Sequence, residues 1–245
     1  MPEYYIGTSG WHYDHWKGLF YPEVLAKAKW LRFYAQHFAT VELNNSFYRL
    51  PSELAFANWR ESSPKGFVFA VKVSRFITHI KRLKNVEEPL QNFLARADFL
   101  QDKLGPLLYQ LPPNMKRNDE TLKAFLSMLP GQYRHVLEFR HESWIDDRVF
   151  EVLRRHNVGL CVFDMPDFTC PVVATADFAY IRFHGSAGLY ASSYTDEELS
   201  DWAKRIAELA TNLKTVYIYF NNDAEAYAVE NASTLAELLG LFSLG

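Results

Sequence analysis

The chain has few cysteines, no long apolar run and no excess of basic residues. Its 245 residues include only Cys161 and Cys170, too few for a disulfide scaffold and typical of a reducing compartment. No apolar run approaches the roughly 20 residues that a membrane span requires. Residues 1–10 lack the basic and apolar regions of a signal peptide. We therefore expect a cytoplasmic protein with no membrane partner.

The balance of acidic and basic residues limits which kinds of binding partner the chain is expected to have. The formal net charge is −3 and the pI is near 6.2, which argues against a broad basic surface for duplex DNA. A local basic pocket is compatible with that balance. Hydrophobic residues make up 49% and charged residues 22%, which is ordinary for a globular protein with a sizeable core.

Short runs of β-branched and aromatic residues recur along the chain and predict eight strands. They cover residues 4–9, 40–44, 67–73, 107–111, 134–139, 158–163, 179–184 and 215–220. Segments with helical spacing lie between them, and Thr195 with Glu198 forms a capping box that starts one helix. This alternation predicts an α/β fold, a single (β/α)₈ TIM barrel over residues 1–245. A doubly wound open sheet is the alternative.

Three connections are atypical. Residues 164–178 contain Pro166 and Pro171 and lack helical periodicity, which predicts an irregular or missing sixth helix. Residues 74–88 and 185–195 form long connections after their strands. Long exit loops of a barrel are where ligand contacts usually arise.

Each predicted strand divides into an apolar set, expected to face the helices, and a second set that faces the barrel interior. In the sixth strand, Cys161 and Phe163 belong to the first set and Val162 and Asp164 to the second. The second set becomes polar toward the end of each strand and comprises Glu42, Asn44, Lys72, Gln110, Glu138, Arg140, Asp164, Arg182, His184 and Asn221. Unpaired charges there would cost several kcal/mol each, so they must pair with one another or bind a charged ligand. A self-contained ion-pair network is the alternative to a site.

These residues favour an enzyme acting on an anionic, phosphate-bearing substrate such as a sugar phosphate or nucleic acid. Loops after strands seven and eight are the usual phosphate site of the fold. Glu42 or Glu138 is predicted to act as general base, and Lys72 or His184 as acid or electrostatic stabiliser. The predicted substrate-binding residues are Ser9, Trp11, Asn44, Tyr48, Gln110, Arg140, Trp144, Asp164, Arg182, Gly185, Asn221 and Asn222.

Two other functions stay open. Aromatic side chains on the exit loops also suit a non-catalytic binding module for a nucleotide or single-stranded nucleic acid, although such side chains commonly just cover the rim. Glu42 and Glu138 could instead form the carboxylate pair of a glycoside hydrolase. No cofactor fingerprint is present. One divalent metal could be held by Glu42, Glu138, Asp164 and His184. The oligomeric state is left open.

Seven segments together carry a family resemblance: residues 7–22, 41–51, 67–79, 107–113, 138–144, 180–185 and 217–223. They resemble the YecE-like family of uncharacterised TIM barrels, a domain of unknown function (DUF72). The resemblance implies the barrel fold and no established activity. The likeness of such barrels to metal-dependent DNA-repair endonucleases suggests nucleic-acid binding by analogy. Those endonucleases hold their metals with a cluster of His, Asp and Glu side chains. The polar residues predicted at the strand ends of this chain include too few such side chains for that cluster.

Overall fold

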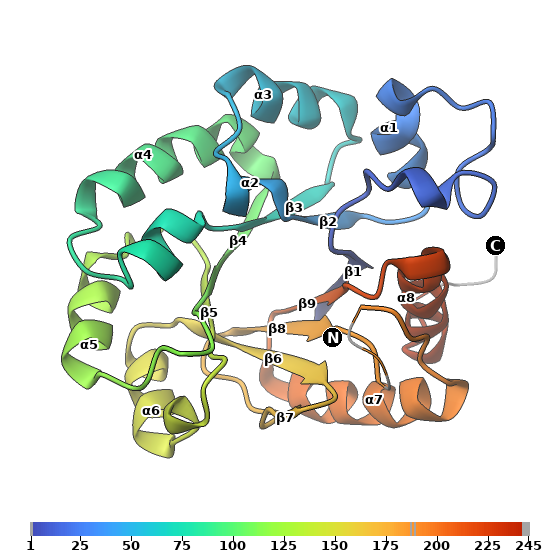
Figure 1. The fold of residues 1–245 in the computed structure, drawn as a ribbon. Helices are drawn as coiled ribbons and strands as arrows, with labels where there is room; N and C mark the ends of the chain where they lie inside the picture. Colours follow the sequence, from blue (N-terminus) through green and yellow to red (C-terminus); the bar gives the residue numbers. More distant parts are fainter. Residues whose placement is uncertain (1, 187, 189, 242–245) are drawn as a thin grey trace. The chain divides into compact units, whose positions relative to one another are not determined.

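The computed structural model describes residues 2–186, 188 and 190–241, and Figure 1 shows its elements. Every predicted strand is present, with ends shifted by up to three residues. The strands are β1 (Glu3–Thr8), β2 (Thr40–Leu43), β3 (Val68–Lys72), β4 (Leu104–Gln110), β5 (His135–Glu138), β6 (Gly159–Met165), β8 (Phe178–Phe183) and β9 (Thr215–Phe220). A two-residue strand, β7 (Phe168–Thr169), pairs antiparallel with β6. No helix lies between β6 and β8, as the prolines in that connection predicted.

The helices follow the strands in turn. They are α1 (Trp30–Tyr34), α2 (Asn45–Tyr48), α3 (Glu53–Ser62), α4 (Glu87–Ala97), α5 (Asp119–Met128), α6 (Asp147–Arg155), α7 (Asp196–Leu209) and α8 (Tyr227–Leu238). The predicted capping box is present at α7, where Thr195 and Glu198 exchange hydrogen bonds. After β3 the chain forms a π-helical turn, η3 (Phe76–Ile80), in a segment predicted only as a long loop.

The strand order along the sheet is β1-β9-β8-β6-β5-β4-β3-β2, with β7 off this path. Neighbouring strands of this order are consecutive in the chain, except that the first strand, β1, pairs with the last, β9. The register is parallel between β1 and β9, β8 and β9, β3 and β4, β4 and β5, and β5 and β6. A parallel bridge joins Ser9 with Glu42, next to β1 and within β2. Parallel strands in chain order with helical crossovers are the (β/α)₈ topology.

The chain divides into two compact units. Unit 1 comprises residues 1–42, 162–173 and 177–245, and unit 2 comprises residues 43–161 and 174–176. The single-domain organisation stays a prediction. Among the described residues, no helix has both the length and the apolar character that crossing a membrane demands.

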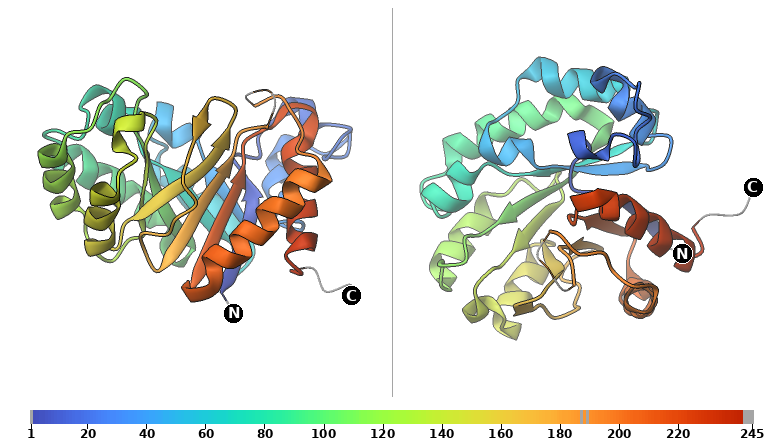
Figure 2. Two further views of the ribbon diagram at one scale, coloured as in Figure 1. Left: turned by 90° about the horizontal axis from the view of Figure 1, so that it is seen from below. Right: turned by 45° about the vertical axis from the view of Figure 1, so that its right-hand side comes forward.

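In unit 1, α8 packs against β1 and β9, and α7 lies beside α8 (Figure 2). Phe183 of β8 contacts Trp202 of α7 edge-on, with ring centroids 5.0 Å apart, and stacks on Phe220. Gly7 permits a close strand approach, because a Cβ there would lie 2.2 Å from the carbonyl oxygen of Thr40. The apolar set of these strands thus faces helices, as predicted.

In unit 2 the same division holds on β4 and β5. Tyr109 packs edge-on against Phe125 of α5, at 5.1 Å between ring centroids. Phe139, directly after β5, stacks on Trp144 at 4.7 Å. The alternate residues, Gln110 and Glu138, are register partners and face away from these rings. In unit 2 the polar side chains of Gln110 and Glu138 therefore lie side by side at the ends of β4 and β5.

Candidate functional site

Glu42 is the centre of a buried polar cluster in unit 1. Its Oε1 accepts hydrogen bonds from Ser9 Oγ and Arg182 Nη2, both at 2.8 Å, and its Oε2 accepts one from Tyr180 Oη at 2.6 Å. Glu42 and Arg182 are both fully buried. The structure thus brings together Glu42 and Arg182, which the strand pattern predicted to share one face, and Ser9, which was predicted as a binding residue.

Sequence reasoning missed the tyrosines of this cluster. Burial, and next the charge of Glu42, raise the pKa of Tyr180 well above its ordinary value, so its hydroxyl remains a donor. Tyr219 of β9 shares a 2.8 Å hydrogen bond with Thr40 Oγ1. Tyr180 and Tyr219 occupy the same strand face as Arg182, and that alternation was the available signal.

The end of β8 is tied to β9 through His184. Asn221 Nδ2 donates to His184 Nδ1 at 3.1 Å, so this ring nitrogen acts as an acceptor. His184 is fully buried and also contacts the ring of Tyr190. Both polar residues predicted at these strand ends are therefore present, in contact with each other.

The loops predicted to hold phosphate already have protein partners. The amide of Gly185, at φ +100°, donates to Tyr194 Oη at 3.1 Å. Asn222 Nδ2 donates to the carbonyl oxygen of Ser192 and to Asn231 Oδ1, both at 2.9 Å. These contacts link the exit loops of β8 and β9 to α8.

The predicted facing of the sixth strand is wrong. Cys161, expected to face the helices, donates from Sγ to Glu138 Oε2 at 3.6 Å. Asp164, expected inside, receives side-chain hydrogen bonds from Tyr194 and from Trp202 of α7. Burial raises the pKa of Asp164, and it lines a cavity of about 320 Å³ beside α7. Since residues alternate along a strand, one misplaced residue reverses the whole set.

Glu138 is the corresponding buried carboxylate of unit 2. Its Oε1 accepts a hydrogen bond from Arg140 Nε, and its Oε2 accepts one from Cys161 Sγ. Gln110 of β4 is its register partner. These three predicted residues therefore lie together, and the charge of Arg140 is balanced locally.

Next to β3, unit 2 carries cations on aromatic rings. Lys72 Nζ lies 4.4 Å from the ring centroid of Phe47, and the imidazole of His79 contacts the same ring edge-on at 5.0 Å. Tyr48, directly after Phe47, is 73% exposed. Lys72 and Tyr48 were predicted site residues, whereas Phe47 was not.

The pKa of His79 is affected by the charges around it. Burial lowers its pKa, and the charges of Lys72, Arg75 and Arg82 lower it further. Sequence reasoning did not select Arg75 or Arg82, although the density of basic residues between 72 and 84 was the available signal. Residues 72–84 thus carry five Lys or Arg side chains directly after and at the end of β3.

Three remaining predicted residues fall into two environments. Trp11 and Trp144 are buried, and Trp144 Nε1 donates to the carbonyl oxygen of Met115 at 2.7 Å. Trp144 thus fixes the β5–α6 connection within unit 2. Asn44 precedes α2, and its Oδ1 is buried with no hydrogen-bond partner among the residues described.

The roles predicted for these residues stay predictions, including catalysis by Glu42, Lys72, Glu138 and His184. Glu42 belongs to unit 1 and Glu138 to unit 2, so the glycoside-hydrolase pairing also stays a prediction. Within residues 2–186, 188 and 190–241, no group of three or more His, Cys, Asp or Glu side chains is arranged to hold a metal ion.

Comparison with known proteins gives a family and a fold. A family model described as "Protein of unknown function DUF72" matches residues 5–243. UPF0759 protein YunF of Bacillus subtilis is 29% identical over 97% of the chain and 95% of its own length. UPF0759 protein YecE of Escherichia coli is 27% identical over 95% of the chain and 91% of its own length. The resemblance predicted from the motifs is confirmed.

A crystal structure of a DUF72 family protein from Thermotoga maritima is also similar. It has 32% identity and a TM-score of 0.89, covering 97% of this chain and 99% of the other. With the strand order above, this likeness confirms the predicted α/β, (β/α)₈ TIM-barrel class.

Proposed function

The chain belongs to the DUF72 family of proteins of unknown function, and we propose that it binds a phosphate-bearing ligand on unit 2. The site is the surface at the ends of β2 and β3, formed by Phe47, Lys72, Arg75, His79 and Arg82. We call it the β3 cationic surface.

The observation that carries the proposal is the grouping of cations around His79. Burial lowers the pKa of the imidazole, and the charges of Lys72, Arg75 and Arg82 lower it further. Like charges held this close repel one another, and a bound phosphate would relieve that repulsion. Residues 71–88 contain five Lys or Arg and two Glu, whereas the whole chain has a net charge of −3.

The loops after β8 and β9 are a weaker candidate. Arg182 hydrogen-bonds to Glu42, and the Gly185 amide is engaged by Tyr194. A ligand at these groups would have to displace buried protein hydrogen bonds, which costs about 1–3 kcal/mol for each polar group left unsatisfied. On the β3 cationic surface a ligand can reach cations from solvent, since Arg75 and Arg82 are exposed.

Isothermal titration calorimetry with ribose 5-phosphate, inorganic phosphate and ribose tests the proposal. We expect the two phosphates to bind and ribose not to bind. Arg75→Ala and Lys72→Met should each weaken binding about tenfold, or about 1.4 kcal/mol. Lys72→Met keeps the apolar stem over Phe47 and removes only the charge.

Arg154→Ala is the matched control, because Arg154 is an exposed cation of α6 in the same unit. It should bind ribose 5-phosphate as the unchanged protein does. The proposal is overturned if ribose binds as well as ribose 5-phosphate, or if Arg75→Ala and Lys72→Met leave the affinity unchanged.

A further inference from the structure

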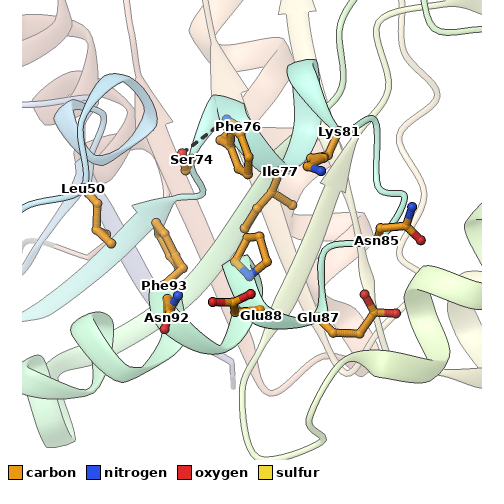
Figure 3. A pocket seen from close by; sticks show the side chains of 11 residues that line it. Leu50, Ser74, Phe76, Ile77, Lys81, Asn85, Glu87, Glu88, Asn92 and Phe93 are labelled. Atoms are coloured by element: carbon orange, nitrogen blue, oxygen red, sulfur yellow. Dashed lines mark hydrogen bonds between the residues drawn. The ribbon is translucent and has the colours of Figure 1, made fainter.

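A groove of about 650 Å³ in unit 2 lies beside the β3 cationic surface. One wall is the segment from Ser74 to Lys81, and the other is the first part of α4 (Figure 3). The volume lies within the range of small-molecule sites, about 300–1,000 Å³. Ser74 and Lys81 belong to the same basic segment that carries Arg75 and His79.

The apolar part of the lining suits a flat ring. Phe76, Ile77, Leu50 and Phe93 line the groove. Phe76 is 41% exposed, so part of its ring is accessible to a ligand, while Ile77 and Phe93 are buried. Exposed aromatic rings of this kind stack on nucleobases.

The polar part of the lining suits a nucleoside. Asn85 and Asn92 present amide groups that both donate and accept, as the edge of a base requires. Glu87 and Glu88, in the first turn of α4, offer carboxylates of the kind that accept hydrogen bonds from ribose hydroxyls. Lys81 Nζ lies over the ring of Phe76, 5.7 Å from its centroid, so a cation borders the aromatic part of the groove.

The groove has a fixed backbone. Arg82, Leu83 and Asn85 adopt φ of 49°, 66° and 52°, a left-handed conformation that non-glycine residues rarely hold. Leu83 is buried, and its amide donates to the carbonyl oxygen of Ile77 at 3.0 Å, which fixes this turn against η3. Such backbone strain clusters at functional sites.

We infer that the phosphate-bearing ligand is a ribonucleotide whose nucleoside lies in this groove, with its base on Phe76 and its phosphate toward Lys81. This inference rests on the proposed function, since it assigns the remainder of the same ligand. The groove supplies recognition of the base and ribose, and the cations of residues 72–82 supply recognition of the phosphate.

Titration calorimetry with the four ribonucleoside 5′-monophosphates and ribose 5-phosphate tests the inference. At least one nucleotide should bind about tenfold more tightly than ribose 5-phosphate. Phe76→Ala should remove that advantage, while ribose 5-phosphate binds as before. Lys81→Met should weaken nucleotide binding about tenfold.

Two matched controls come from the same unit. Phe99 is 38% exposed and lies outside the groove, so Phe99→Ala should leave nucleotide binding unchanged. Lys84 is exposed in the same segment and also lies outside the lining, so Lys84→Met should do the same. Thermal unfolding of each variant checks that it is folded.

The outcomes separate the two claims. If no nucleotide binds more tightly than ribose 5-phosphate, yet Arg75→Ala weakens ribose 5-phosphate binding, the inference is overturned and the proposed function stands. If nucleotides bind and Phe76→Ala weakens them, while Arg75→Ala and Lys72→Met have no effect, the β3 cationic surface is overturned instead. Equal loss in the Phe99→Ala control would also overturn the inference.

Discussion

Single residues in this protein show how buried charge is balanced. Glu42 receives hydrogen bonds from Ser9, Tyr180 and Arg182, and no part of the Glu42 side chain is exposed. Removing one partner of a buried ion pair costs about 3–5 kcal/mol, because the other charge stays buried without compensation. The cluster is therefore expected to stabilise unit 1 whether or not it also takes part in a reaction.

Glu42→Gln should lower the free energy of unfolding by about 3–5 kcal/mol, measured by urea denaturation. The double variant Glu42→Gln/Arg182→Met should recover much of that loss, because it removes both charges. Glu61→Gln is the control, since Glu61 contacts Arg60 at 3.3 Å on an exposed surface. Such pairs contribute about 0–1 kcal/mol. A Glu42→Gln variant as stable as the Glu61→Gln variant would contradict this account.

The alternation of residues along a strand predicted which side chains share a face wherever the helix-facing set was apolar and the interior-facing set was polar. It placed Glu42 with Arg182 and Glu138 with Arg140, as the hydrogen bonds show. It failed on β6, because a cysteine has the polarity of a core residue and yet donates a hydrogen bond to a carboxylate. Tyr180 was missed for a similar reason, since its ring reads as apolar and only its hydroxyl is polar.

The start of α7 carries a complete capping box. Thr195 Oγ1 accepts a hydrogen bond from the Glu198 amide at 3.2 Å, and Glu198 Oε2 accepts one from the Thr195 amide at 2.8 Å. Asp196, Glu197 and Glu198 add negative charge to the first turn, where the helix dipole favours it. The helix positions Trp202, which hydrogen-bonds to Asp164.

Thr195→Ala should lower the free energy of unfolding by about 0.5–2 kcal/mol, because it leaves the Glu198 amide without its acceptor. Urea denaturation monitored by circular dichroism measures the change. Ser200→Ala, inside α7, should be neutral or slightly stabilising, because alanine has the higher helix propensity. If both variants lose the same stability, the capping box has no stabilising role.

Elements with a clear period were predictable, and those without one were not. The apolar stripes identified α4, α5 and α7, and the prolines after β6 identified the missing helix. The π-helical turn η3 spans only Phe76–Ile80, too short for any period to emerge. That turn carries His79 and borders the groove, so a segment of the proposed binding site was not predictable from its period.

For the whole molecule, eight predicted strands separated mostly by helical segments were sufficient to predict the (β/α)₈ topology. They did not predict which polar groups at the strand ends already have protein partners. The fold-level rule favoured the loops after the seventh and eighth strands, but their groups bond to Tyr194, Ser192 and Asn231. Whether a polar group finds a hydrogen-bond partner within the protein depends on distances between residues far apart in sequence. No local sequence pattern encodes those distances.

Stability of the whole chain should depend on its histidines. Burial lowers the pKa of His12, His79 and His135 below the usual value of 6.5. His135 Nε2 donates to the carbonyl oxygen of Pro130, and its Nδ1 accepts from Tyr109 Oη, so the neutral ring satisfies both partners. The unfolded chain therefore binds protons at a higher pH than the folded chain does, and stability rises with pH through that window.

The melting temperature should accordingly fall as the pH is lowered from about 7.5 to 6, a range that begins above the unfolded histidine pKa. His135→Gln should flatten this slope, whatever its effect on stability at pH 7.5. His156→Gln, at an exposed position after α6, should leave the slope unchanged. Burial raises the pKa of Asp164 and Asp223, so the folded chain takes up protons at these carboxyls at a higher pH than the unfolded chain does. Protonation of these two carboxyls therefore stabilises the folded chain as the pH falls. Their contribution grows as the pH approaches the unfolded carboxyl pKa of about 3.9, and it should partly offset the loss there. A slope between pH 7.5 and 6 that is zero or reversed would contradict burial of neutral histidine in the folded chain.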